Sequence, residues 1–176
     1  PGSFTGLRIG LATMRMMAQV RRAPLAGISS PELFTWLYAE KGQTLITAFD
    51  AKKGKVFGGA CRRNGNGVST LVPPGDYYPA DLAGALRKET DGAIQLFGDG
   101  TRTYGEVFAQ ELPDAVPITE RTPDAAALLA HYTALFQSNR EGYHWEKVLP
   151  DYARIADAEA ALRASSRPPA GDDASA

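Results

Sequence analysis

The stretch APLAGISSPELFTWLYAEKGQTLITAFDAKKGKVFGGACRR, residues 23–63, decides the fold class. Its first apolar run, Pro24–Ile28, predicts a short buried strand, and a helix capped by Ser29 or Ser30 follows it. The remainder predicts a β-hairpin, because two β-prone runs flank a loop in which Gly54 can take a positive φ. Strands that alternate with helices indicate the α/β class, and the hairpin makes the sheet mixed.

The chain on either side continues this alternation. A turn is expected at Asn64–Gly67, a helix from Pro79, a buried strand over residues 93–97, and a second helix capped by Thr122. The final residues, 161–176, are poor in apolar side chains and rich in Pro, Ser and Ala, so we expect a disordered tail there.

Composition excludes several classes of protein. The 176 residues carry a net charge of −1, which gives no basic field for nucleic acid, and no apolar run reaches membrane-spanning length. Cys61 is the only cysteine, which excludes a disulfide framework and a cysteine-rich zinc site and fits the cytoplasm. His131 and His144 have no metal-ligand spacing, and nothing assembles a base, a nucleophile and an orienting group. We therefore expect neither catalytic nor metal-binding residues.

The helix expected from Leu7 onward is apolar around most of its circumference. One apolar stripe comprises Leu7, Leu11, Met14 and Ala18, and a second comprises Ile9, Ala12, Met16 and Val20. The polar stripe between them is narrow and holds Arg8, Arg15, Gln19 and Arg22. Such a helix is buried on more than one side, so one side should face the protein's own sheet and the other needs a second cover. Missing residues of the same chain, or a partner subunit, could supply that cover.

The turn before this helix allows two interpretations. Ser3 or Thr5 can cap the helix, while Gly2 and Gly6 permit a close approach of another backbone. Free N–H groups at a helix start also suit a phosphate, so Gly2, Ser3, Thr5 and Gly6 form an alternative phosphate-contact turn. The Lys and Ser/Thr of a Walker-type phosphate loop do not follow.

Five stretches in order carry a resemblance to a known family. They are PGSFTGLRIGLAT, APLAGISSPELF, FDAKKGKVF, FGDG and LPDYARIADAE, between Pro1 and Glu159. Together they resemble the TsaB (YeaZ) family. The resemblance implies the actin-like, sugar-kinase and Hsp70-type ATPase fold, once classed as glycoprotease-like (M22 peptidase-like), with mixed sheets and flanking helices. It also implies an N-terminal truncation without the opening strands of the first lobe. Residues 1–40 would be the remainder of that lobe, 41–160 the second lobe and 161–176 the tail.

The resemblance further implies a function without catalysis. Family members pair with the catalytic subunit TsaD, which carries out N6-threonylcarbamoylation of adenosine 37 in tRNAs that read ANN codons. Where TsaD has an Asn-His-x-x-x-His metal motif, this chain has Ser29 in place of the Asn, and Ser30 and Phe34 in place of the two histidines. The resemblance implies no cofactor on this chain alone, ATP at the assembled complex, a TsaE-type ATPase as a further partner, indirect contact with tRNA, and no membrane. A metallopeptidase or nucleotide hydrolase of the same fold is the alternative.

The first helix is the predicted partner-binding surface. The helical wheel leaves open which apolar stripe faces the partner, TsaD or a second copy, and we favour the stripe beside the arginines. The predicted partner-binding residues are therefore Leu7, Arg8, Leu11, Met14, Arg15 and Ala18. Tyr152 and Arg154, in the last of the five stretches, are expected to pack back on the domain.

Overall fold

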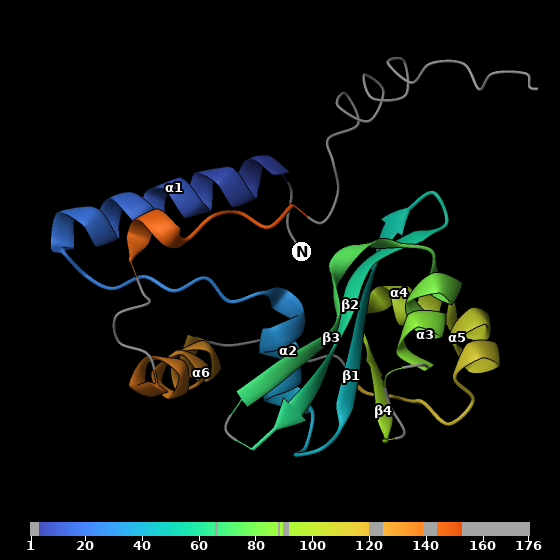
Figure 1. The fold of residues 1–176 in the computed structure, drawn as a ribbon. Helices are drawn as coiled ribbons and strands as arrows, with labels where there is room; N and C mark the ends of the chain where they lie inside the picture. The colour runs from blue at the N-terminus through green and yellow to red at the C-terminus, as the bar shows by residue number, and fades with distance from the viewer. Residues whose placement is uncertain are drawn as a thin grey trace, which may run out of the picture.

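The computed structural model describes residues 4–65, 67–87, 89, 92–119, 125–138 and 144–152 (Figure 1). The helices and strands are, in order, α1 (Phe4–Arg21), α2 (Ser30–Tyr38), β1 (Thr44–Lys52), β2 (Lys55–Asn64), β3 (Gly67–Tyr77), α3 (Pro79–Arg87), β4 (Ile94–Phe97), α4 (Asp99–Thr103), α5 (Gly105–Glu111), β5 (Val116–Pro117), α6 (Ala125–Ser138) and the 3-10 turn η2 (Trp145–Lys147). No helix within these ranges is long and apolar enough to cross a bilayer.

The strands form one mixed sheet in the order β3-β2-β1-β4-β5. β1 pairs antiparallel with β2, and β2 pairs antiparallel with β3, so residues 44–77 run as a meander. β4 lies parallel to β1, and β5 lies parallel to β4. The predicted α/β class with a mixed sheet is confirmed.

Helices cover both faces of this sheet, with α2 on one side and α3, α4 and α5 on the other (Figure 1). Because side chains alternate along a strand, β1 sends Ile46 and Ala48 to one face and Leu45 and Phe49 to the opposite face. The larger core joins β1 and β2 to α3 and α5, and includes Ile46, Val56, Leu82, Leu86, Leu96 and Phe108. The smaller core lies under α2 and joins Leu45 and Phe97 to Phe34, Tyr38 and Phe49.

Local signals in the sequence placed several elements correctly. Ser29 is the N-cap of α2, and its hydroxyl accepts a hydrogen bond from Glu32 N at 3.4 Å. The β1–β2 hairpin forms as predicted, and Gly54 turns it with φ +77°. α3 begins at Pro79, and β4 covers most of the strand expected at 93–97. The Thr122 cap and the tail 161–176 lie outside the described residues.

One predicted strand is wrong, and five elements were not anticipated. Pro24–Ile28 has no strand structure and forms the connection between α1 and α2. It pairs with no strand of the described sheet, so its backbone lacks the hydrogen bonds to a neighbouring strand that would make it a β-strand. The elements without a sequence prediction are β3, α4, α5, β5 and η2.

α1 does not pack on the sheet, contrary to the expectation for one of its two apolar sides. It lies apart from the strands and alongside the segment 144–152 (Figure 1), and its main packing partner is η2. α2, by contrast, packs on β1, β2 and β3. The boundary drawn at residue 40 between two lobes stays a prediction.

Candidate partner-binding helix

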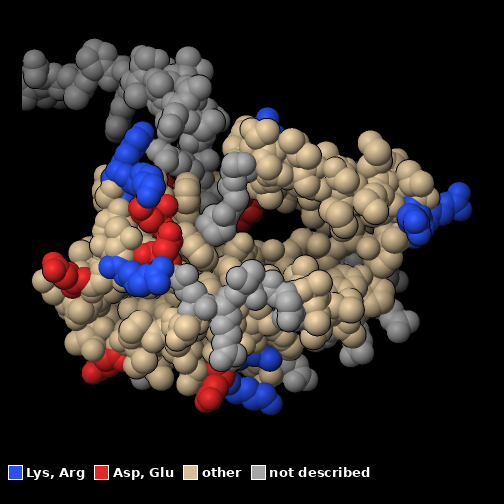
Figure 2. All heavy atoms as spheres, turned by 180° about the vertical axis from the view of Figure 1, so that it is seen from behind, with Lys and Arg blue, Asp and Glu red and all other residues tan. Residues whose placement is uncertain are grey.

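The surface of α1 is apolar and open. Exposed fractions reach 63% for Ile9, 66% for Met16 and 79% for Val20, and Ala18 is the one residue of the helix that is buried. The helix contains no acidic residue, and its basic residues are Arg8, Arg15 and Arg21. In Figure 2, α1 lies in the projection at the upper right, which is largely uncharged and has basic side chains near its outer end. Contiguous exposed apolar surface of this kind is typical of an interaction site.

The structure divides the six predicted partner-binding residues into two groups. Leu7 and Met14 are 40% and 49% exposed and remain open to a partner. The other four, Arg8, Leu11, Arg15 and Ala18, lie on one arc of the helix, and both arginines of that arc contact the segment 144–152.

Segment 144–152 binds this arc through two aromatic side chains. Arg8 Nε donates a hydrogen bond to the Tyr152 hydroxyl at 2.8 Å, and the Tyr152 ring lies 5.1 Å from the Phe4 ring. The Arg15 guanidinium lies 5.6 Å from the Trp145 ring. Tyr152 packs against α1 and stays 39% exposed, so it folds back on the chain but on this helix and not on the sheet; Arg154 lies outside the described residues. No local pattern predicts a role for Trp145, because its contact with Arg15 joins residues 130 positions apart.

The predicted phosphate-contact turn is described only in its second half. α1 already includes Phe4, so Thr5 and Gly6 lie in its first turn and Thr5 is not the N-cap. Both residues are exposed. Gly2 and Ser3 lie outside the described residues, and the phosphate interpretation stays a prediction.

The stretch Ile28–Phe34, compared above with a metal-binding motif, has structural roles here. The Ser29 side chain caps α2, and Ser30 is the first residue of the helix. The Phe34 ring packs at 4.6 Å from the Phe97 ring and 5.6 Å from the Phe49 ring. The position that would carry the second histidine is therefore part of an aromatic core. Across the described ranges, no three His, Cys, Asp or Glu side chains are grouped so that they could hold a metal ion.

A buried polar contact joins α2 to α6. His131 is fully buried, its Nε2 lies 3.2 Å from Glu32 Oε1, and its ring packs against the Trp36 ring with the centres 4.5 Å apart. Arg63 covers the Trp36 ring, with its guanidinium carbon 3.4 Å from the ring centre. Burial lowers the pKa of His131, and the neighbouring Glu32 opposes that shift only in part. His131 is therefore a core residue of the fold.

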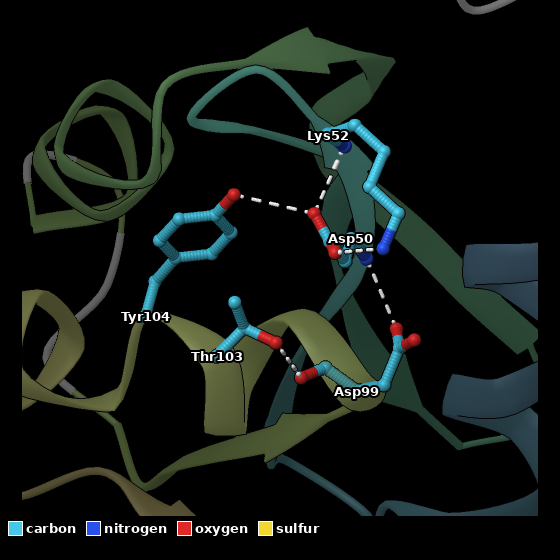
Figure 3. Close-up of polar contacts among 5 residues, drawn as sticks. All are labelled: Asp50, Lys52, Asp99, Thr103 and Tyr104. Atoms are coloured by element: carbon cyan, nitrogen blue, oxygen red, sulfur yellow. Dashed lines mark hydrogen bonds and ion pairs between the residues drawn. The ribbon is translucent and has the colours of Figure 1, made fainter.

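A second polar cluster joins two of the stretches on which the family resemblance rests (Figure 3). Asp99, at the start of α4, accepts a hydrogen bond from the backbone N–H of Asp50 at 3.0 Å. The Asp50 carboxylate in turn accepts from Lys52 N, Lys52 Nζ and the Tyr104 hydroxyl. Asp99 thus links the start of α4 to the neighbouring strand β1.

These contacts determine what the cluster can do chemically. The hydrogen bonds from Lys52 lower the pKa of Asp50, while loss of solvation and the bond to Asp50 raise the pKa of Tyr104. A carboxylate with a lowered pKa is a poor general base near neutral pH. The role of the cluster is therefore structural: its hydrogen bonds connect the β1–β2 hairpin to Asp99 at the start of α4 and to Tyr104 just after α4.

Comparison with solved structures defines the class of protein. YeaZ from Pseudomonas aeruginosa is similar, with a TM-score of 0.65 and 20% identity over 86% of this chain and 70% of that chain. A protein described as similar to peptidase YEAZ from Pseudomonas aeruginosa also has a TM-score of 0.65, with 19% identity over 88% of this chain and 70% of that chain. The fold is thus that of the actin-like, glycoprotease-related α/β proteins.

Sequence comparison gives the family within that class. The family model described as "TsaD: tRNA N6-adenosine threonylcarbamoyltransferase" matches residues 1–161. A relative from Bacillus subtilis, the tRNA threonylcarbamoyladenosine biosynthesis protein TsaB, is 26% identical over 163 residues, which is 91% of this chain and 69% of the relative. The chain belongs to this threonylcarbamoyltransferase-related family, in its TsaB/YeaZ group.

Proposed function

We propose that the chain is a non-catalytic subunit of the cytoplasmic machinery that makes threonylcarbamoyladenosine in tRNA, and that it pairs through α1 with the catalytic subunit TsaD. The family match and the name of the Bacillus subtilis relative support the pathway. The observation that carries the pairing is the open apolar surface of α1. A TsaE-type ATPase and ATP would join only at the assembled complex, and tRNA would be contacted indirectly.

The energetics of α1 favour a protein partner over solvent. Seven large apolar side chains of the helix are between 40% and 79% exposed: Phe4, Leu7, Ile9, Met14, Met16, Met17 and Val20. Complete burial of one such side chain contributes about 1.5–3 kcal/mol, so covering even part of this set stabilises a complex by several kcal/mol. Gly10 adds a point at which a partner's backbone can come close to the helix. It has no side chain, and no atom of this chain lies within 4 Å of where a β-carbon would be.

The contacts of α2 support a subunit without catalysis. Ser30 and Phe34 stand where the resemblance aligns the two histidines of the TsaD metal motif; Ser30 is the first residue of α2 and Phe34 is part of an aromatic core. A neutral Ser is a poor metal ligand, and Phe is none. We infer that the reaction takes place on the partner.

The test places one negative charge on each side of α1 and measures pairing with purified TsaD by isothermal titration calorimetry. Met14→Glu charges the side that we favour, and Met16→Glu charges the opposite side. Gln19→Glu is the matched control, because it adds the same charge to the polar stripe of the same helix. We expect Met14→Glu to weaken pairing at least tenfold, since a carboxylate buried in an apolar interface is strongly disfavoured. Gln19→Glu should bind like the wild type.

The same titrations can refute the proposal. Wild-type affinity in both methionine variants would show that α1 is not the interface. A loss in Met16→Glu alone would move the interface to the side of Ile9 and Val20. Sedimentation of the chain without TsaD distinguishes this pairing from a homodimer through the same helix.

A further inference from the structure

α1 needs an attachment that fixes which side it presents, because it has no extensive packing against the sheet. A helix attached at one point can rotate about its axis, and a rotation of 100° replaces each residue on a given side by its neighbour in sequence. Recognition of one side of α1 therefore requires at least two contacts along its length.

The first contact is a stack of three side chains. The Arg8 guanidinium lies 4.0 Å from the centre of the Phe4 ring and 5.6 Å from the centre of the Tyr152 ring. The hydrogen bond from Arg8 Nε to the Tyr152 hydroxyl, at 2.8 Å, gives the stack a defined orientation. The planar guanidinium serves both functions, since it stacks on rings and donates hydrogen bonds in its plane.

The second contact lies two helical turns further along. Arg15 follows Arg8 by seven residues, which places both arginines on one side of α1 about 10 Å apart. The Arg15 guanidinium faces the Trp145 ring at 5.6 Å. Between these aromatic residues, Val148 packs close to Gly27 in the connection after α1, 3.1 Å from the position of a β-carbon there.

We infer that segment 144–152 sets the rotation of α1, with Tyr152 and Trp145 as positioning residues for partner recognition. The two aromatic residues hold the arginine side of the helix toward the protein's own chain. Leu7 and Met14 at the edge, and Ile9, Met16 and Val20 beyond, are thereby presented outward. This inference rests on the proposed pairing with TsaD. In it, Arg8 and Arg15 contact segment 144–152 of the same chain and not the partner.

The test uses a graded pair of variants of the full chain, with Tyr78→Phe as the matched control. Tyr152→Phe removes the hydroxyl and keeps the ring, whereas Tyr152→Ala removes both. Tyr78 is an exposed tyrosine outside α1 and segment 144–152. Two quantities are measured: affinity for TsaD by calorimetry, and hydrogen exchange of the α1 amides in the chain without partner.

We expect Tyr152→Phe to weaken pairing by about two-fold to tenfold, the range for one hydrogen bond, and Tyr152→Ala to weaken it further. Exchange in α1 should accelerate in the same order, while the amides of β1 and β2 exchange at wild-type rates. The separate readout in the sheet distinguishes positioning from general destabilisation.

Wild-type affinity in Tyr152→Ala would overturn the inference even if exchange in α1 accelerates. Unchanged exchange in α1 would overturn it as well, because the helix would then be held in another way. A wild-type chain that does not bind TsaD at all would instead refute the proposed function on which the inference rests. The two failures are therefore distinguishable within one set of titrations.

Discussion

Replacing Gly98 with alanine tests whether the turn between β4 and α4 requires glycine. Gly98 has φ +105° and ψ 158°, a backbone conformation essentially restricted to glycine, and a side chain there costs about 1–3 kcal/mol. A β-carbon at this position would also lie 2.3 Å from the carbonyl oxygen of Ala48, in the middle of the buried strand β1. Since β1 cannot move without disturbing both cores, we expect Gly98→Ala to lower the free energy of unfolding by about 3 kcal/mol or more.

Two other glycines separate the backbone strain from the steric contact. Gly54 has φ +77° with no atom within 4 Å of a β-carbon, so Gly54→Ala should cost only the strain, about 1–2 kcal/mol. Gly84, inside α3, is equally open and lacks the positive φ, so Gly84→Ala should stabilise the chain by about 0.5–1 kcal/mol. Urea unfolding of the three variants measures these differences. Equal destabilisation by Gly98→Ala and Gly54→Ala would refute the steric argument.

Two further predictions follow from the contacts of α2. Because burial holds the pKa of His131 below its ordinary value of 6.5, the unfolded chain takes up this proton at a higher pH than the folded chain. The free energy of unfolding should therefore fall as the pH decreases through 6.5, and His131→Gln should reduce this dependence. Metal analysis of the purified chain should find no stoichiometric iron or zinc, since Ser30 and Phe34 replace histidine ligands; one tightly held metal ion per chain would contradict the non-catalytic assignment.

The sequence predicted the elements that have strong local signals. The Ser29 cap and the Gly54 turn are examples, because each depends on a few neighbouring residues. β3 was missed because Pro73 and Pro74 interrupt its pattern, and prolines are tolerated there only since β3 lies at the edge of the described sheet.

The candidate site, too, was predictable only where its signal is local in the sequence. The apolar pattern of α1 indicated a helix that needs covers on two sides, and the exposed surface of Met16 and Val20 agrees with an uncovered side. The identity of the cover on the other side was not predictable, because Tyr152 and Arg8 are 144 positions apart. The buried pair of Glu32 and His131 joins residues 99 positions apart and leaves no periodic trace in the sequence.

The two outer strands of the sheet limit how this chain can associate with another. β3 contains two successive prolines, and its pairing with β2 shifts register twice, whereas β5 at the opposite edge has only two residues, one of them Pro117. Proline offers no backbone N–H, and short or irregular edges give an incoming strand little to pair with. Within the described part of the chain, the sheet is thus protected against extension by a foreign strand. Assembly is therefore directed to helix side chains, whose contacts can form and separate without exposing a ladder that would promote aggregation.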